Sequence, residues 1–492
     1  MRTNRTYLLA ILLMTVVSCA TNPVTGKRQI NLVSEGQEVA MGQQAHPEII
    51  RQFGVYDEKP ELNRLVDRVG KRIAAVSDRP NLPWTFTILD TPMINAMAVP
   101  GGYIYITRGM LEQINSEDEL AGVIGHEITH VTARHSAQQI TKQQLAQFGM
   151  VLGAVVAGPQ VLQQYGQIAE IALGLLFQRY SRQHETEADL VGTGYIAKAN
   201  YNPVGAEQML MVLMRLNKNP ASGIDQYFLS HPDPAKRVRD VQSKLAELRA
   251  AGPVPSDPPN RRGYVSLLDG IVTGNSTQTT VIRDGTVYDR THGLIIPPPN
   301  GWQATAGQGV LFSMAPRGNQ AGSMSFVAQE VDINQLQGSN VQDAVRNGFA
   351  KMGLQYAGSR EAATGTGERF AIDAWAGQTQ AGQVGVETTQ FRHGDHVTVF
   401  MFLAPSLSRT ESPLTEVLRR TTIDRNRAQA AQPPRMKIGT VKSRESWADV
   451  ARRATGNAND AEAVANMNGF DLKTAPTSGM TVKLPQDVVS SR

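Results

Sequence analysis

The spacing of apolar residues along the first third of the chain alternates between two periods. A period of 3.6 predicts helices over residues 34–53 and 60–76, the first opened by a Ser–Gln capping pair, and a long helix from residue 116 towards 147. A period of two predicts strands over residues 84–89 and 103–107. We therefore expect this part of the chain to be mainly helical with a small β-sheet.

The pattern changes after residue 262. Predicted strands lie at 310–314, 325–330, 385–391 and 396–402, and predicted helices at 341–352 and 412–420. The sequence His393-Gly394-Asp395-His396 could suggest a metal site, but Gly-Asp between two strands is better explained as a hairpin turn. We expect an α/β domain here without a catalytic constellation; its residues 298–302 faintly resemble the opening of a Mog1/PsbP-like sandwich.

Proline-rich stretches divide the 492 residues, which are too many for one compact core. The expected units are a signal peptide at 1–18, a tether at 19–33, a mainly helical domain at 34–250, a linker at 251–262, an α/β domain at 263–424, a second linker at 425–435 and a small module at 436–486.

The small C-terminal module is predicted to have the order strand, helix, helix, strand, at 440–442, 447–454, 461–467 and 481–484. This order resembles a LysM module. The usual Gly-Asp-Thr turn is replaced by Arg444-Glu445-Ser446, which puts glycan binding in doubt.

Residues 143–169 carry no charged side chain. Their apolar run is short, is broken by Gly158-Pro159 and is followed by glutamines. Helices that pack beside a cleft, as a lid, are favoured over a dip into a membrane, and another buried helix is expected at 168–177.

Composition excludes several classes of protein. The hydrophobic content of 41% and charged content of 19% are those of ordinary globular domains. Removing Arg2 and Arg5 with the signal peptide from the 48 basic residues leaves 46 against 44 acidic ones. This balance, without a basic run interleaved with aromatics, indicates no nucleic-acid partner.

The N-terminus has the features of an export signal. Two arginines precede an apolar stretch that is too short for a stable membrane span, and Val16-Val17-Ser18-Cys19 resembles a bacterial lipobox. The alternative is an ordinary signal peptide with an incidental cysteine. Acylation of Cys19, the single cysteine, would leave no thiol, and Ala20 after it suggests the periplasmic face of the outer membrane over the inner membrane.

The pattern His126-Glu127-x-x-His130 carries the candidate chemistry. On a helix, residues four apart share a face, so both imidazoles can reach one metal ion. Glu127 lies to one side and is placed to take a proton from a water on that metal. The alternative is a chance match on a charged helix.

A second helix is expected to supply the third ligand. Glu185 and Asp189 share one face, so Glu185 can complete a His, His, Glu set that leaves an open position for water. Asp189 can accept a hydrogen bond from the outer nitrogen of a ligand histidine. His135, His184 and Glu187 point elsewhere and are interpreted as surface or structural residues.

Upstream of the metal helix, Asn95, Ala96, Gly101 and Gly102 mark a strand bounded by glycines. Such a strand suits a sheet edge that binds an extended peptide by strand addition. An ordinary hairpin explains the same residues equally well.

These motifs, in this order, resemble the zinc metallopeptidase (gluzincin) family of HtpX, the CAAX prenyl protease and the periplasmic β-barrel assembly-enhancing protease, over residues 22–248. The resemblance implies one Zn²⁺ per chain, held by His126, His130 and Glu185, with Glu127 as general base and the 95–102 segment as substrate edge. His231 with Arg237 matches the family's His-Pro segment. There they stabilise the oxyanion, and in some periplasmic members the histidine plugs the open metal position.

The expected fold is multidomain α+β: a helical zincin-type protease domain with a small β-sheet, an α/β sandwich-like domain and a LysM-like βααβ module. The expected function is zinc endopeptidase action on unfolded or misassembled envelope proteins by a lipoprotein anchored at Cys19. Peptidoglycan or outer-membrane assembly machinery are further candidate partners. A chaperone with a latent, His-plugged zinc site is the main alternative, and a peptidoglycan amidase is a weaker one.

Overall fold

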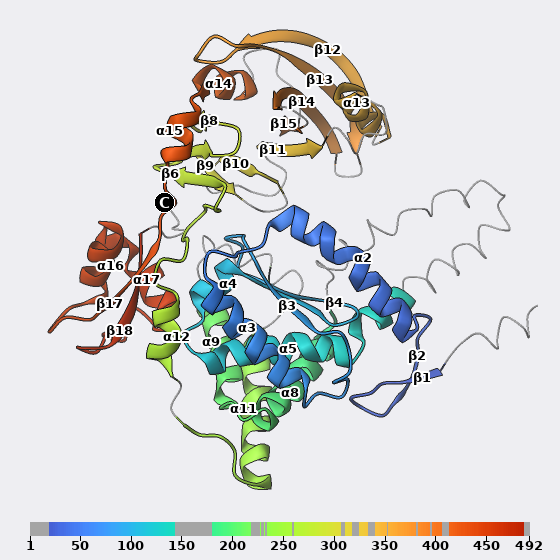
Figure 1. Cartoon of the computed structure of the whole chain (residues 1–492), viewed down its shortest axis with the longest axis vertical. Helices are drawn as coiled ribbons and strands as arrows, with labels where there is room; N and C mark the ends of the chain where they lie inside the picture. Colours follow the sequence, from blue (N-terminus) through green and yellow to red (C-terminus); the bar gives the residue numbers. More distant parts are fainter. Residues whose placement is uncertain are drawn as a thin grey trace, which may run out of the picture.

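The structure, a computed structural model, describes residues 19–142, 180–217, 227, 231, 234–257, 260–306, 310–316, 324–332, 340–351, 353–379, 382–393, 396–405 and 413–486. Figure 1 shows a helical region with a small sheet (blue to green), a curved β-sheet region above it (yellow to orange) and a small module at one side (red). The prediction of a multidomain α+β protein with a helical first domain is confirmed.

A three-stranded sheet lies inside the first domain. In spatial order its strands are β3 (Thr85–Leu89), β5 (Tyr103–Thr107) and β4 (Ala96–Val99). β3 runs parallel to β5, whereas β4 returns antiparallel through Gly101 and Gly102, whose φ angles are +88° and +99°. Among the described strands, β4 is therefore an edge of this sheet.

Helices cover both faces of the sheet. α2 (Glu35–Phe53) starts with the predicted capping box of Ser34 and Gln37 and packs on one face. α3 (Pro60–Ala74) and α5 (Glu117–Thr132) pack on the other face. A Cβ at Gly101 would lie 2.8 Å from the Glu38 carbonyl oxygen, so glycine lets α2 approach the hairpin turn.

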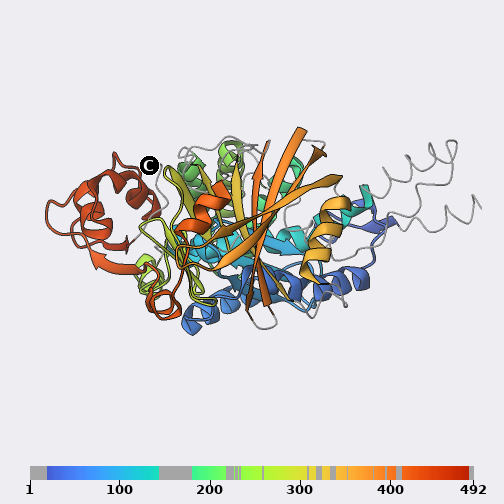
Figure 2. The same cartoon turned by 90° about the horizontal axis from the view of Figure 1, so that it is seen from above.

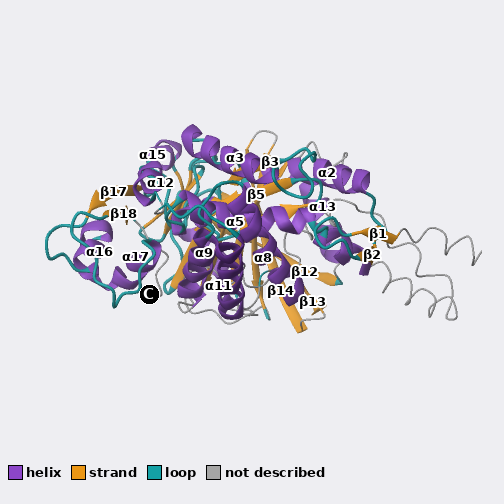
Figure 3. Cartoon of the chain, turned by 90° about the horizontal axis from the view of Figure 1, so that it is seen from below, coloured by secondary structure: helices purple, strands orange, loops and turns teal. Residues whose placement is uncertain are grey.

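The remaining helices of this domain are α4 (Arg108–Gln113), α8 (Arg182–Lys198), α9 (Val204–Asn217) and α11 (Pro234–Ala251). Figure 3 shows α8, α9 and α11 beside α5. α5 and α8 approach closely where two glycines face each other, since a Cβ at Gly192 would lie 2.8 Å from the Gly125 carbonyl oxygen. This approach brings His126, the next residue of α5, against α8.

The segment expected to be a tether is packed on the first domain. β1 (Cys19–Thr21) and β2 (Arg28–Ile30) form an antiparallel hairpin. After the hairpin, the backbone N–H of Leu32 donates to Thr141 Oγ1 at 3.0 Å. The segment predicted as a tether at 19–33 is thus an extended hairpin that hydrogen-bonds with residues following α5.

The long helix predicted from Ser116 towards residue 147 is interrupted. α5 ends at Thr132, Arg134 has a φ of +60°, and residues 135–142 form a separate helical segment. Arg134 is held there by Glu38 Oε1 at 3.1 Å and the Val33 carbonyl oxygen at 2.7 Å. The segments predicted at 143–169 and 168–177 lie outside the described residues. Within the described part of the chain, no helix combines the length and apolarity that a membrane crossing requires.

The middle region contains two antiparallel sheets, of order β12-β13-β14-β15-β11-β10-β9 and β16-β8-β7-β6. Their strands are β6 (Thr280–Arg283), β7 (Thr286–Asp289), β8 (Leu294–Ile296), β9 (Trp302–Ala306), β10 (Phe312–Pro316), β11 (Ser325–Asp332), β12 (Leu354–Ala363), β13 (Arg369–Thr379), β14 (Gly382–His393), β15 (His396–Ala404) and β16 (Thr422–Ile423). In Figure 2 the larger sheet crosses above the first domain.

The helices predicted in this region are present as α13 (Val341–Lys351) and α14 (Pro413–Arg420). His393 pairs with His396 across β14 and β15, so the hairpin prediction is confirmed and residues 394–395 lie outside the described part of the chain. A separate hydrophobic core fills the space between the two sheets and α14.

The C-terminal module follows the predicted order, with β17 (Met436–Thr440), α16 (Trp447–Thr455), α17 (Ala461–Met467) and β18 (Thr481–Pro485). β17 lies before the predicted strand at 440–442. Trp447 and Val482 of the module belong to the same hydrophobic cluster as Leu120 and Ile124 of α5. The first domain and this module therefore share one core.

In the sequence, the middle region is an insertion between two segments that both contribute to this shared core. α12 (Arg261–Leu267) and the residues up to Val272 pack in the shared cluster, and Val272 forms an antiparallel bridge with Arg435. The second predicted linker contains α15 (Arg425–Ala430), with Ala428 buried. The expected boundaries at 263 and 425–435 are thus corrected: the chain leaves the core after Val272 and returns at Arg435.

Candidate metal centre

Helix α5 carries the first part of the site. The Ser116 side chain accepts from the backbone N–H of Glu119. Acidic residues occupy the first turn, where their negative charge interacts favourably with the positive end of the helix dipole. His126 and His130, one turn apart, direct their Nε2 atoms at each other across 3.0 Å. Both imidazoles are buried.

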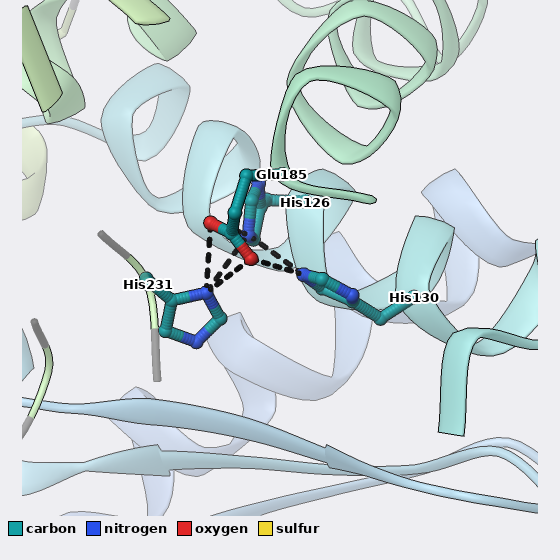
Figure 4. Close-up of side chains that lie close together, drawn as sticks. All are labelled: His126, His130, Glu185 and His231. Carbon is teal, nitrogen blue, oxygen red and sulfur yellow. Dashed lines mark hydrogen bonds and ion pairs between the residues drawn. The ribbon is translucent and has the colours of Figure 1, made fainter. Parts of the chain in front are cut away.

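Helix α8 brings the carboxylate. Its Ser181 cap accepts from the backbone N–H of His184, which starts the helix just before Glu185. The Glu185 oxygens lie 3.6 Å from His126 Nε2 and 3.4 Å from His130 Nε2. His231 completes the cluster, with its Nδ1 atom 3.0 Å from Glu185 Oε1 (Figure 4). The structure thus brings together the three predicted ligands and His231, which the resemblance assigned to the oxyanion or to a plug.

The donor set fits a zinc ion. Asp189 can only accept, so a neutral His126 donates from Nδ1 and presents a lone pair at Nε2, facing His130 Nε2. A cation between these nitrogens satisfies both of them. Ligand atoms of His126, His130, Glu185 and His231 all lie within 4.8 Å of one another, and imidazole nitrogen with carboxylate oxygen is the set that catalytic zinc sites use.

Asp189 holds the His126 ring, as predicted. Its Oδ1 atom lies 2.9 Å from His126 Nδ1. Arg237 in turn donates two hydrogen bonds to Asp189, from Nε to Oδ2 at 2.7 Å and from Nη2 to Oδ1 at 2.8 Å. Its Nη1 atom lies 3.0 Å from Glu185 Oε2. The guanidinium is thus engaged with the candidate ligand Glu185 and with Asp189 behind His126, whereas its predicted contact with an oxyanion stays a prediction.

Two buried residues beside His130 were missed as parts of the site. His135, interpreted as a surface or structural residue, is buried with its Nδ1 atom 2.9 Å from His130 Nδ1. Tyr180 stacks on the His130 ring at a centroid distance of 3.9 Å. His184 is also buried and stacks on His135, while Glu187 is partly exposed. The helix interruption at Arg134 is what brings His135 inwards, and no local pattern indicated that interruption.

The electrostatics of the site separate its two glutamates. Burial raises the pKa of Glu127, which suits a group that must both take and release a proton. Burial would also raise the pKa of Glu185, but His231 and Arg237 hold it well below the usual range. Burial lowers the pKa of His130 well below its usual value, which keeps that ring neutral for a metal.

Glu127 points into the site without being one of the clustered ligands. Its Oε1 atom lies 3.9 Å from His231 Nε2, and its buried Oε2 atom has no hydrogen-bond partner in the described part of the structure. A buried carboxylate oxygen left in this state is free to accept from a water. Ser230 and Pro232, which flank His231, lie outside the described residues.

The predicted substrate segment forms a hairpin whose outer strand is β4, which begins at Ala96. Peptide binding along this strand stays a prediction. Asn95 precedes β4, fully buried, with its Oδ1 atom accepting from the Ala96 N–H and its Nδ2 atom unpartnered in the described structure. Gly101 and Gly102 form the turn, so their positive φ angles account for them without a ligand.

Comparison with known proteins agrees with the motifs. Residues 60–245 match the model of "Peptidase family M48". The mitochondrial metalloendopeptidase OMA1 of Schizosaccharomyces pombe is 32% identical over 229 residues, which cover 46% of this chain and 66% of that protein.

Two bacterial proteins match over a similar region. The β-barrel assembly-enhancing protease of Escherichia coli K12 is 27% identical over 244 residues, 47% of this chain and 48% of that protein. The putative β-barrel assembly-enhancing protease of Vibrio cholerae is 32% identical over 221 residues, 43% and 44% of the two chains. The chain therefore spans between 44% and 66% of the length of these three relatives.

Proposed function

Because residues 60–245 form a peptidase family M48 domain, we propose that this protein is a zinc-dependent endopeptidase of the bacterial cell envelope that cleaves unfolded or misassembled proteins. The observation that carries the proposal is the buried cluster of His126, His130 and Glu185 with Glu127 beside it. The export signal and the relatives named for β-barrel assembly support the envelope as the place of action.

Each residue of the cluster has a distinct task in this proposal. A zinc ion held by His126, His130 and Glu185 would supply Lewis acidity, which lowers the pKa of a bound water to about 7. Glu127 takes the proton of the attacking water and delivers it to the leaving nitrogen. Asp189 keeps His126 in the tautomer that presents Nε2 to the metal.

An extended peptide would bind by adding a strand to β4. The outer side of β4 pairs with no other described strand, and the backbone groups of an edge strand are free to pair with a peptide. Unfolded segments offer such backbone groups whereas folded domains do not. The proposed substrate class follows from this edge.

The replacement Glu127→Gln tests the reaction. It keeps the shape of the side chain but removes the base, so we expect the rate of cleavage of denatured casein to fall by roughly 10²–10⁴-fold with zinc still bound. Glu119→Gln, a buried glutamate of the same helix away from the ligands, is the matched control and should retain activity. Wild-type cleavage by a zinc-loaded Glu127→Gln protein would exclude the mechanism.

A second candidate, a chaperone or assembly factor with a latent zinc site, is favoured by the position of His231. Its Nδ1 atom lies among the ligand atoms, 3.4 Å from His126 Nε2, and its ring stacks on buried Tyr227. A histidine in that place occupies the position that water needs. In this candidate the middle region and the C-terminal module would act by binding partners.

The replacement His231→Ala separates the plugging role, which the second candidate requires, from a catalytic role of His231. An imidazole that acts as a plug restrains the reaction, so its removal would increase cleavage of denatured casein several-fold. A loss of cleavage would instead identify His231 as an oxyanion-stabilising group, as the family resemblance implies. Zinc content measured on both proteins shows whether the metal site itself is intact.

We further propose that acylation of Cys19 anchors the protein at the periplasmic face of the outer membrane. The lipobox-like sequence supports this location. The LysM-like order of the C-terminal module supports peptidoglycan as a partner, although Arg444-Glu445-Ser446 replaces the usual turn. Mass spectrometry of the intact mature protein would detect the acyl chains, and sedimentation with purified sacculi would detect glycan binding.

A further inference from the structure

We propose that His135 and Glu187 are positioning residues that fix the tautomer and ring orientation of His130, and that the N-terminal hairpin completes this support. The inference deepens the proposed function, because it rests on a metal bound by His130. It differs from the family motifs, which assign the ligands, the base and the groups near the oxyanion.

The first step is the contact between the two imidazoles. His130 and His135 are both fully buried, and their Nδ1 atoms lie 2.9 Å apart. His135 reaches this place because α5 stops at Thr132 and the chain turns at Arg134, whose φ is +60°. In an uninterrupted helix His135 would lie on another face. A non-glycine residue rarely adopts this conformation, so contacts must hold the turn in place.

The second step is the tautomer that the contact requires. For His130 to bind a metal through Nε2, its proton must sit on Nδ1, where it donates to His135 Nδ1. His135 then carries its own proton on Nε2, which must point at an acceptor. The Glu187 carboxylate faces that atom, with Oε1 3.8 Å away, which is an electrostatic contact longer than a hydrogen bond, and His135 Nε2 has no hydrogen-bond partner in the described part of the structure. A proton on His135 Nε2 is therefore favoured by the charge of Glu187, and that carboxylate is the acceptor nearest to hand when the site closes around a metal.

The third step links this chain of residues to the N-terminal hairpin. Asn22, in the turn of the hairpin, donates from Nδ2 to Glu187 Oε1 and to the Ala133 carbonyl oxygen, each at 3.4 Å. Asn22 is itself buried, and its Oδ1 atom accepts from the backbone N–H of Val24 at 2.8 Å. The residues just after Cys19 thus brace both the turn that places His135 and the carboxylate beyond it.

The two ligand histidines therefore have different supports. His126 donates directly to a carboxylate, that of Asp189. On its Nδ1 side, His130 instead contacts a second imidazole, that of His135, and the Glu187 carboxylate lies beyond that ring. Removing the outer partner of a zinc ligand typically weakens metal affinity about 10–100-fold.

Zinc affinity of the full chain, measured by competition with a chromogenic chelator, tests the inference. His135→Leu removes the acceptor and should weaken zinc binding by about 10–100-fold. His135→Asn places an amide oxygen near the position of Nδ1 and should bind zinc close to the wild-type affinity. His184→Leu is the packing control, because it removes the imidazole stacked on His135 but none of the contacts that link His130, His135 and Glu187. Its zinc affinity should stay near wild type.

The outcomes are distinct. Wild-type affinity in His135→Leu, or equal weakening in His135→Leu and His135→Asn, would overturn the inference, because the hydrogen bond would then have no role. If circular dichroism shows that His135→Leu does not fold, the inference is tested instead with two replacements of the partly exposed Glu187. Glu187→Ala must weaken zinc binding, and Glu187→Gln, which keeps an acceptor oxygen, must not. A wild-type protein that binds no zinc would instead refute the proposed function.

Discussion

Arg237 shows how one buried side chain can hold two carboxylates of the candidate site in place. Its guanidinium spans Asp189 and Glu185, and all three side chains are almost completely buried. Burial works against a charged guanidinium, but the two carboxylates outweigh it and raise the pKa of Arg237 further above its ordinary value. One permanent cation, Arg237, thus balances the two buried carboxylates of Glu185 and Asp189.

We expect Arg237→Met to lower the free energy of unfolding by about 3–5 kcal/mol, because it leaves two buried carboxylates without their cation. Urea denaturation followed by circular dichroism measures this. Arg237→Lys restores the charge but not the forked geometry and should recover only part of the loss. Unchanged stability combined with a reduced kcat would argue that Arg237 acts on the oxyanion instead.

The ligands were predictable at this scale, but their supports were predictable only in part. A spacing of four residues on a helix fixes the relation of His126 to His130 whatever the rest of the fold does. Asp189 was found for the same reason, since it lies one turn beyond Glu185. His135 was missed because its direction depends on the turn at Arg134, which residues distant in sequence stabilise.

Among the elements, β18 carries a buried lysine that joins the C-terminal module to the first domain. Lys483 Nζ donates to the carbonyl oxygens of Glu112 and Ile114, at 2.7 Å and 3.0 Å, where α4 ends. Burial lowers the pKa of Lys483 well below its usual value. Through its two hydrogen bonds, Lys483 satisfies carbonyl oxygens that have no partner within the helix because they lie at its C-terminal end.

Replacing Lys483 by methionine should lower the free energy of unfolding by about 2–4 kcal/mol, because the buried carbonyl oxygens lose their donor. Tryptophan fluorescence during urea titration can follow the change. Lys473→Met, at an exposed position of the same module, should shift stability by no more than about 0.5 kcal/mol. Equal stability of Lys483→Met and wild type would mean that water replaces the lysine without loss.

Element prediction succeeded where local signals decide and failed where they do not. α2 and α16 have capping residues at their starts, and both were predicted with accurate limits. α15 was predicted as linker because Arg425–Ala430 is short and polar, although Asp424 caps it by accepting from the Arg427 N–H and was the local signal that could have found it. The packing of the segment at 19–33 could not be predicted from local signals, since its partners lie beyond α5.

At the scale of the whole molecule, the composition of the sequence shows where the proline-rich breaks lie. It does not show which of the units between them share a hydrophobic core. The apolar residues of the C-terminal module, such as Trp447 and Val450, have the pattern of an independent small core. In the structure they join the cluster around α5, more than three hundred residues earlier in the sequence. Contacts over such separations leave no periodic signal in the chain.

The shared core also orders events during synthesis. The helix that bears His126 and His130 emerges from the ribosome early, yet the hydrophobic core to which it belongs also contains residues near Val482, which are translated after the whole inserted region. A nascent chain therefore has its ligands long before it has the complete frame that holds them in place. The peptidase domain can reach its final packing only once translation is almost finished, so an unfinished polypeptide is poorly equipped to cut its neighbours or itself.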